Sequence, residues 1–520
     1  MAISYPLLED AIFHLVNLSI KEKIFAEAWK IQLVMPLHKK GDKLLGSNYR
    51  AVSHIVEVGK IFENVIYDQV YTHFVENNIF HPNHHGFLGN HSTATALIQL
   101  YDLWLEASEK TELSAALLLD LTSAFDVVDH EIFIQKLEAY NFSQDSVAWF
   151  SSYLKNRTQI VQVESKLSSP VVLGDFGVPQ GSILGPLIFL IFNNDFPASS
   201  VEGTSVLFAD DDTDNTSDKN PVELIEKIQR EADRSAAWVE DNKMACAGDK
   251  TKLLIIGTKQ LRANKLNDHE ENLNVNVCGA EVKATESEKL LGLIINNELT
   301  WRHYLYGESW RLPEKDNLPG LLSQLSQRVG MLRKLEKIVP KNKFRMLCNG
   351  IFDSKVLYCL QVFGNVWGFG YDETMRRSYG FTKKDSRRLQ VLQNKVCRLK
   401  TGLGYDVSTA DLLKADNDFS VHQLTAYHTL LTVQKVKTSH KPKYLDDRLK
   451  FKMENNGGNQ RHAYKIQVDQ RLSIARAGFV YRGGLLWNQL PDSLRTNASL
   501  ENFKKGARRW VQSNVKVKPG

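Results

Sequence analysis

The chain has few cysteines and no long hydrophobic run. Its five cysteines among 520 residues stand far apart without a C-x-x-C pair, so the sequence offers neither a disulfide framework nor a zinc knuckle. The longest apolar run, 183–192, is too short to cross a bilayer. No basic start precedes an apolar core at the N-terminus. We therefore expect no membrane insertion and no secretion, and an intracellular location in the nucleus and/or the cytoplasm.

The charge is unevenly distributed along the chain. A hydrophobic content of 43% and a charged content of 24% are ordinary for a globular protein. The formal net charge of +5 conceals a polarity, because 371–400 carries nine Lys and Arg against three acids and 496–520 carries six against one. The remainder is acidic. This pattern suggests a polyanion held beside a metal site, although basic helix faces are often merely solvated.

An apolar segment runs straight into three consecutive carboxylates in SVLFADDDTDNTSDKN, at 205–220. Such a run can be a solvated acidic loop, a calcium loop, or a short strand that delivers Asp210 and Asp211 to a metal. The calcium loop fails because Ser217 stands where a tight turn needs glycine and Pro221 interrupts the loop. The strand interpretation requires another carboxylate from elsewhere in the chain.

A second strand that ends in an aspartate lies upstream. The apolar run 115–119 ends at Asp120, and a helix capped by Asp129 is expected after it. Two such strands side by side in one sheet would bring Asp120 and Asp210 to the same edge, where oxygen ligands can hold divalent ions. Taken alone, Asp120 fits a strand-end turn residue better than a metal ligand, and only the pair of aspartates favours a metal site.

The order of three motifs carries a family resemblance. LDLTSAFD, GVPQGSILGPLIF and FADD follow one another at 119–126, 177–189 and 208–211, and this order resembles the palm of a reverse transcriptase of the non-LTR (LINE-type) retrotransposons. The resemblance continues upstream in PLHKKGDKLLGSNYRAVS and HHGFLGNHST. Downstream it continues in NKMACAGDKTK, EKLLGLIINNELTW and the tail YRGGLLWNQLPDSLR, so it covers essentially the whole chain.

The resemblance implies an α+β right-hand polymerase. The expected divisions are fingers at 1–112, a ferredoxin-like palm with the catalytic carboxylates at 113–300, a helical thumb at 301–400, and a basic, mixed C-terminal extension at 401–520. An upstream endonuclease domain and a cysteine-rich knuckle are absent from the chain relative to the usual layout, so it is expected to be a fragment or a truncated copy. Ala51 and Leu88 replace a customary proline and arginine.

The resemblance also assigns roles to individual residues. The catalytic and metal-binding set is Asp120, Asp210 and Asp211, with two Mg²⁺ ions, and Lys250 is a candidate general acid. Asp212 has no family role and is expected to point into solvent. The residues expected to bind the incoming dNTP and the nascent pair are Lys40 (or Lys39), Arg50, Phe125, Gln180 and Gly181, and those of the primer grip are Leu291 and Gly292.

Two functions follow from these assignments. The first is an RNA-directed DNA polymerase, a nucleotidyltransferase that copies an RNA template from a DNA primer with dNTPs. The second is a decayed copy that binds nucleic acid without polymerising. In either case basic residues beyond 330 are expected to track the duplex through its phosphates, with Arg376, Arg377, Arg387 and Arg388 as candidates.

Overall fold

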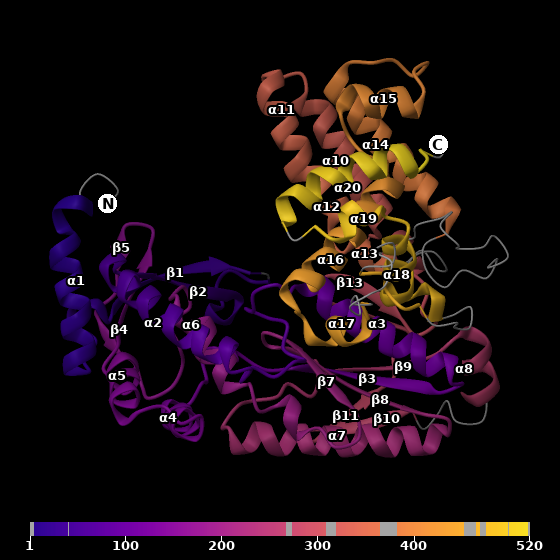
Figure 1. Cartoon of the computed structure of the whole chain (residues 1–520). Coiled ribbons are helices and arrows are strands. Elements are labelled where there is room, and N and C mark those ends of the chain that lie inside the picture. The colour runs from indigo at the N-terminus through magenta and orange to yellow at the C-terminus, as the bar shows by residue number, and fades with distance from the viewer. Residues whose placement is uncertain are drawn as a thin grey trace, which may run out of the picture.

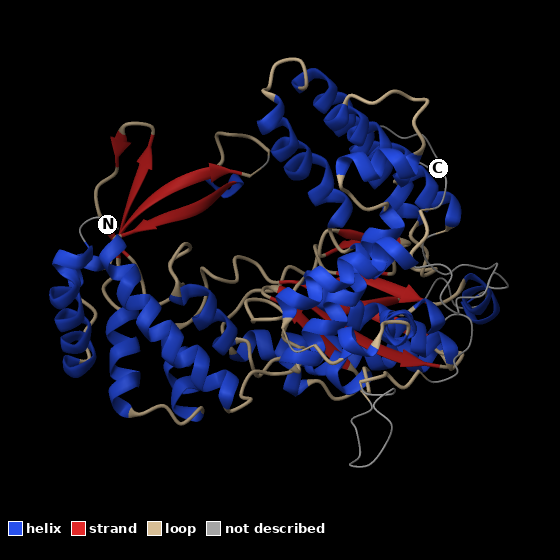
Figure 2. Ribbon diagram, turned by 45° about the horizontal axis from the view of Figure 1, so that its top comes forward, coloured by secondary structure: helices blue, strands red, loops and turns tan. Residues whose placement is uncertain are grey.

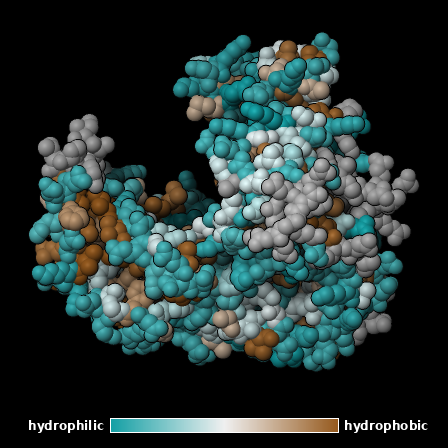
Figure 3. Space-filling view, viewed as in Figure 1, coloured by the Kyte–Doolittle hydropathy of each residue, from teal (hydrophilic) through white to brown (hydrophobic). Residues whose placement is uncertain are grey.

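A computed structural model of the chain has two arms that rise from a shared base (Figure 1). It describes residues 5–39, 41–266, 273–307, 319–364, 382–451, 464–468, 475–497 and 499–517. One arm is formed by N-terminal strands and helices and the other by helices beyond residue 320. The surface is hollowed between the two arms (Figure 3). Within the described residues, no helix combines the length and the apolar character that a membrane crossing requires.

The base of the molecule is a four-stranded antiparallel sheet. Its order is β7-β8-β3-β9, and the strands are β3 (Leu113–Asp120), β7 (Thr204–Phe208), β8 (Asp211–Asp218) and β9 (Lys252–Ile256). Three helices connect β3 to β7, namely α4 (His130–Ala139), α5 (Gln144–Leu154) and α6 (Leu184–Phe192), and α7 (Pro221–Asp241) connects β8 to β9. This βαββαβ order confirms the ferredoxin-like palm. Asp129 caps α4 as expected, because its side chain accepts the Ile132 backbone N–H at 3.0 Å.

Helices cover both faces of the palm sheet. The face that includes Asp214 packs on α7, whereas Trp104 of α3 (Thr93–Glu109) approaches from the other face and donates to Asn215 Oδ1 at 2.7 Å. Strand β8 is therefore buried on both sides although its residues are polar. Beyond β9 come α8 (Lys259–Leu266) and two hairpins, β10 (Asn274–Val277) with β11 (Ala280–Lys283) and β12 (Ser287–Leu290) with β13 (Leu293–Asn296).

A second sheet forms the N-terminal arm (Figure 2). Its order is β2-β1-β4-β5, with β6 also paired to β4. The strands are β1 (Ile31–His38), β2 (Tyr49–Ile55), β4 (Thr158–Val163), β5 (Lys166–Leu167) and β6 (Val171–Val172), and they lie near α1 (Tyr5–Glu22) and α2 (Glu57–Glu76). Residues 158–172 thus extend the fingers sheet although they fall within the segment assigned to the palm by sequence.

The second arm is helical. Its helices are α9 (Arg302–Tyr306), α10 (Leu321–Leu335), α11 (Lys341–Cys348), α12 (Ser354–Leu357), α13 (Leu360–Phe363) and α14 (Lys383–Thr401). The C-terminal extension adds α15 (Thr409–Asp416), α16 (Val421–Ser439), α17 (Lys443–Arg448), α18 (Phe479–Asn488), α19 (Asp492–Arg495) and α20 (Leu500–Asn514). In its described parts the extension is helical rather than mixed, apart from one bridge between Phe451 and Ile466. One hydrophobic core joins α3, the thumb and this extension.

A buried carboxylate attaches the C-terminal extension to α3. Asp102 accepts the backbone N–H groups of Phe479 and Val480, at 2.8 and 3.3 Å, at the first turn of α18. Its neighbour Glu106 pairs with Arg448 of α17. A helix N-terminus favours a negative charge, but burial outweighs this effect and raises the pKa of Asp102 to about 6.

The raised pKa of Asp102 predicts a pH-dependent stability. The folded state holds the proton more tightly than the unfolded state, so the contribution of Asp102 to stability falls as the pH rises toward 6 and stays low above it. Asp102→Asn removes this effect. Between pH 5 and pH 8 we expect the wild type to lose about 1 kcal/mol of unfolding free energy relative to Asp102→Asn in urea titrations. A difference that does not change with pH would contradict this prediction.

Candidate active site

The FADD motif forms the tip of a tight hairpin. Strands β7 and β8 are joined by Ala209 and Asp210, and Ala209 takes a left-handed φ of 61°, which is uncommon for a residue with a side chain. Because β8 lies between β7 and β3, Asp211 is the register partner of Asp120. The expectation that the strand leading to Asp210 lies directly beside β3 is therefore wrong: the returning strand intervenes. The three aspartates nevertheless converge at one end of the sheet.

The segment 83–87 supports the outer side of this hairpin. Leu207 donates its backbone N–H to Asn83 O at 3.0 Å, and its carbonyl accepts the His85 N–H at 2.8 Å. Gly86 lies so close to the turn that a Cβ at this position would be 2.3 Å from Ala209 N. Only a glycine fits this approach, so the HHGF motif of the fingers fixes the position of the FADD turn.

Asp120, Asp210 and Asp211 are all exposed at the end of the sheet. Loss of hydration, followed by the charges of Asp210 and Asp120, raises the pKa of Asp211 to about 6. Mutual repulsion of this kind is relieved by a cation. Three carboxylates with no nitrogen or sulfur ligand among them suit a hard divalent ion, so the residues fit the divalent metal chemistry that reverse transcriptases generally use.

Asp212 does not point into solvent. Only 4% of its surface is exposed, and neither carboxylate oxygen has a hydrogen-bond partner. Side chains alternate along a strand, so Asp212 faces α7 while Asp211 faces the other side of the sheet. Burial, followed by the charge of Asp214, raises the pKa of Asp212 well above its usual range. The sequence-based prediction failed because it treated the whole triplet as a turn.

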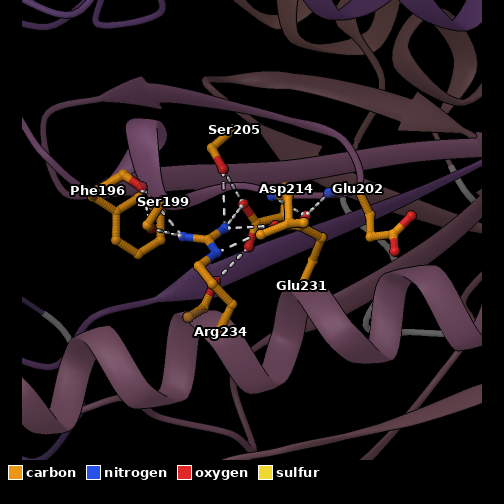
Figure 4. Close-up of polar contacts among 9 residues, drawn as sticks. Phe196, Ser199, Glu202, Ser205, Asp214, Glu231 and Arg234 are labelled. Atoms are coloured by element: carbon orange, nitrogen blue, oxygen red, sulfur yellow. Dashed lines mark hydrogen bonds and ion pairs between the residues drawn. The ribbon is translucent and has the colours of Figure 1, made fainter.

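Asp214, two residues further along β8, is fully paired (Figure 4). Arg234 of α7 donates to its carboxylate at 2.6 Å, Ser235 donates at 2.6 Å, and Ser205 of β7 also donates to it. Arg234 in turn pairs with Glu231 at 3.0 Å. This cluster ties the β7–β8 hairpin to α7. The Arg234 guanidinium is engaged by Asp214 and Glu231, so it does not pair with Asp212.

Replacement of Asp212 is expected to stabilise the fold. A buried carboxyl without partners costs about 1–3 kcal/mol, so Asp212→Val should raise the unfolding free energy by this order. Thr213→Val, at the next buried position of β8, is the matched control and should change stability little. Chemical denaturation of the three proteins measures the effect. Destabilisation by Asp212→Val alone would show that its carboxyl has a partner in solution.

Lys250 lies in a turn that contacts the end of β3. Ala247 donates its backbone N–H to Asp120 O at 2.9 Å, and the Lys250 N–H donates to Ala247 O at 3.0 Å. The Lys250 side chain is exposed. The loop therefore brings this lysine to the same end of the sheet as the carboxylates.

The residues expected around the incoming nucleotide surround the same region. Phe125 stacks on Phe189 with ring centroids 4.3 Å apart, which fixes its ring. Gln180 donates to Asp126 at 2.7 Å. Gly181 has a φ of 118°, and a Cβ there would lie 2.5 Å from Ser53 O of β2, so the glycine allows close approach to the fingers strand.

Only some of the basic residues predicted to bind phosphate lie among the described residues. Arg50 is exposed on β2, opposite Leu37 of β1. Lys40, Arg376 and Arg377 lie outside the described residues. Arg388 lies over the ring of Tyr306 at 5.0 Å, and Arg387 shares α14 with it.

The predicted primer grip is the turn between β12 and β13. Leu291 and Gly292 have φ values of 45° and 82° and form a two-residue hairpin turn. Tyr358 of the thumb donates its hydroxyl to Leu291 O at 2.6 Å. The thumb thus holds this turn directly.

Sequence reasoning missed a basic cavity beside this turn. It has a volume of about 500 Å³, and its lining includes Lys289, Arg328, Lys355 and Tyr358 together with Gly292. Burial, followed by the charges of Arg328 and Lys289, lowers the pKa of Lys355. These cations are far apart in sequence and form no charge run, so only the tertiary structure identifies a site for a polyanion here.

Another group of metal-ligating residue types lies where the thumb meets the C-terminal extension. Cys397, Asp416 and Asp418 each offer an atom within 4.8 Å of the others. Lys400 Nζ lies among them, 3.2 Å from Asp416 and 3.7 Å from Asp418, so a cation already neutralises the group. This cluster is a structural ion-pair network.

Comparison with known protein families identifies the domain that contains these residues. The model of the family described as reverse transcriptase (RNA-dependent DNA polymerase) matches residues 37–295, which include the three carboxylates and the β12–β13 turn. Residues 37–295 are a reverse transcriptase domain. The assignment agrees with the α+β polymerase fold and with the order of the sequence motifs.

The reverse transcriptase domain has relatives in flies. The chain is 24% identical over 401 residues to the probable RNA-directed DNA polymerase from transposon X-element of Drosophila melanogaster. The matched region covers 76% of this chain and 40% of that protein. It is 25% identical over 411 residues to the RNA-directed DNA polymerase from mobile element jockey of the same organism, covering 77% and 40%. The chain thus spans about two fifths of the length of these relatives.

Solved telomerase structures from yeasts are also similar. Telomerase from Candida tropicalis in complex with a fragment of telomeric RNA covers 94% of this chain and 65% of its own, at 9% identity and a TM-score of 0.40. The apo form from the same organism gives 10% identity and a TM-score of 0.39. These values are too low to add to the assignment.

Proposed function

We propose that the chain is an RNA-directed DNA polymerase of a non-LTR retrotransposon, which extends a DNA 3′-hydroxyl on an RNA template. The convergence of Asp120, Asp210 and Asp211 at one end of the palm sheet, inside a reverse transcriptase domain, carries this proposal. The substrates are an RNA template, a DNA primer and dNTPs.

The carboxylates would hold two Mg²⁺ ions. Asp120, Asp210 and Asp211 would be the residues that hold them, with Asp211 on the primer side. When bound, the ions activate the primer hydroxyl and neutralise charge on the transferred and leaving phosphates. Burial, followed by the charges of Asp210 and Asp120, raises the pKa of Asp211, and a bound cation would stabilise its ionised form, which supports this assignment.

The surrounding residues would select and position the nucleotide. Arg50, with Lys40, would bind the triphosphate, and Lys250 would protonate the departing pyrophosphate. Phe125 would occupy the space that a ribose 2′-hydroxyl needs, and its stacking on Phe189 makes that exclusion rigid. Gln180 would line the nascent pair beside Gly181, from a loop anchored to β2 by the Ser53 N–H at 2.9 Å from Gln180 O.

Primer extension tests the proposal. The purified wild type should extend a DNA primer annealed to an RNA template with Mg²⁺ and dNTPs, whereas Asp210→Asn should lose synthesis and keep template–primer binding. Asp218→Asn, an exchange of the same kind at the far end of β8, is the matched control and should extend normally. The alternative is a decayed copy that only binds nucleic acid, which the unpaired Asp212 in the catalytic strand favours. Binding without extension by the wild type would support it.

The cations beside the primer grip predict the salt dependence of binding. Lys289→Gln and Lys355→Gln should each weaken template–primer binding and reduce the slope of log Kd against log salt by about 1, because each removes a phosphate contact. Lys334→Gln, on α10 and outside this cavity, should leave the slope unchanged. Fluorescence anisotropy over a salt series measures both quantities. Equal slopes in all four proteins would contradict a phosphate track here.

A further inference from the structure

Helix α3 holds the β7–β8 hairpin at two points. Near the middle of β8, the Trp104 indole donates to Asn215 Oδ1 at 2.7 Å. The second point lies at the turn and is indirect, because segment 83–87 stands between α3 and the FADD motif. Most of α3 is buried, including Gln99, and closely packed interiors transmit small displacements. The helix is therefore a firm support for both points.

Segment 83–87 is a loop whose backbone meets the hairpin at Leu207 and Ala209. Ala209 has the left-handed φ of 61°, a conformation that costs free energy in a residue with a side chain and persists where the surroundings impose it. A loop imposes a conformation on its neighbour only if its own position is fixed. The contacts that fix this loop therefore bear on the FADD turn.

Side chains of α3 fix the loop. The His85 imidazole lies between two of them, with Nδ1 2.9 Å from Thr95 Oγ1 and Nε2 2.8 Å from Gln99 Oε1. The Gln99 amide also donates through Nε2 to Asn83 Oδ1 at 2.9 Å. Asn83 and His85 are the two residues whose backbones pair with Leu207, so one glutamine joins both.

The contacts of Gln99 define the direction of each hydrogen bond. Because its Nε2 donates to Asn83, its Oε1 must accept the proton of His85 Nε2. Burial lowers the pKa of His85 to about 3, so the ring is neutral and Nδ1 is an acceptor that faces the Thr95 hydroxyl. A buried amide with both ends engaged has one orientation, so the network is rigid.

We propose that Gln99 is a positioning residue for the metal-binding aspartates. Through His85 and Asn83 it fixes the FADD turn, and with it the placement of Asp210 relative to Asp120 at the end of β3. The inference rests on the proposed function, in which these carboxylates hold divalent ions. It adds that the affinity for those ions depends on a side chain of α3 that contacts neither the ions nor the substrate.

Binding of Mn²⁺ alone tests this inference, because Mn²⁺ shares the oxygen ligands that suit Mg²⁺, and electron paramagnetic resonance measures the free ion. Gln99→Met keeps the length of the side chain and removes both hydrogen bonds. Its dissociation constant for Mn²⁺ should rise about tenfold, the lower end of the effect of losing a group that orients metal ligands. Gln99→Glu, which can still accept from His85 and bond to Asn83, should bind Mn²⁺ like the wild type.

Two further variants separate positioning from folding. Tyr101→Phe removes a hydrogen bond of 3.2 Å from the same helix to Leu299 O, and should lower stability without changing the dissociation constant for Mn²⁺. Asn83→Ala, at a half-buried position, keeps the test valid if Gln99→Met does not fold. It breaks the link to Gln99 and should also weaken Mn²⁺ binding.

An unchanged dissociation constant in folded Gln99→Met, or in Asn83→Ala if only that variant folds, would overturn the inference and leave the metal site intact. An equal rise in Tyr101→Phe or in folded Gln99→Glu would also overturn it, because the effect would then not follow the hydrogen bonds of Gln99. Asp210→Asn tests the proposed function separately. If it binds Mn²⁺ as the wild type does, the carboxylates are not the metal site and both proposals fail.

Discussion

The antiparallel pairing of β3 with β8 is the constraint on which the site depends. The register runs without interruption from Leu113 opposite Asp218 to Asp120 opposite Asp211, and it forces two carboxylates together at the end of the sheet. Asp210 adds a third from the adjoining turn. Loss of hydration, followed by the charges of Asp210 and Asp120, raises the pKa of Asp211 there. In the proposed function, this arrangement would hold cations and, through them, phosphates.

The rest of the palm supports that register. Strand β8 carries few apolar side chains, so its position depends on polar contacts: Asp214 with Arg234 on one face and Asn215 with Trp104 on the other. Segment 83–87 supports the β7–β8 turn, and Tyr358 of the thumb donates its hydroxyl to the β12–β13 turn at Leu291 O. Asp212 is the exception to these polar contacts, because it is a buried carboxyl on β8 whose oxygens have no hydrogen-bond partner.

Local pattern and motif order predicted the palm, its two aspartate-bearing strands and the Asp129 helix cap, because these are set by residues close together in sequence. The pairing of strands that are distant in sequence could not be predicted from local patterns. The insertion of β8 between β7 and β3, and the pairing of residues 158–163 with β1, depend on contacts between distant segments. The same holds for the cavity lined by Lys289, Arg328 and Lys355, which form no motif. Asp212 could have been placed from strand alternation had β8 been recognised as a strand.

The claim that the clustered aspartates form the metal site is tested most directly by iron-mediated cleavage. Fe²⁺ substituted for Mg²⁺ generates hydroxyl radicals that cut the backbone beside the bound ion, and peptide mapping locates the cuts. The account predicts cleavage around both Asp120 and Asp210 in the wild type, and its loss at both segments in Asp120→Asn. Cleavage confined to other segments, or unchanged cleavage in Asp120→Asn, would contradict the account.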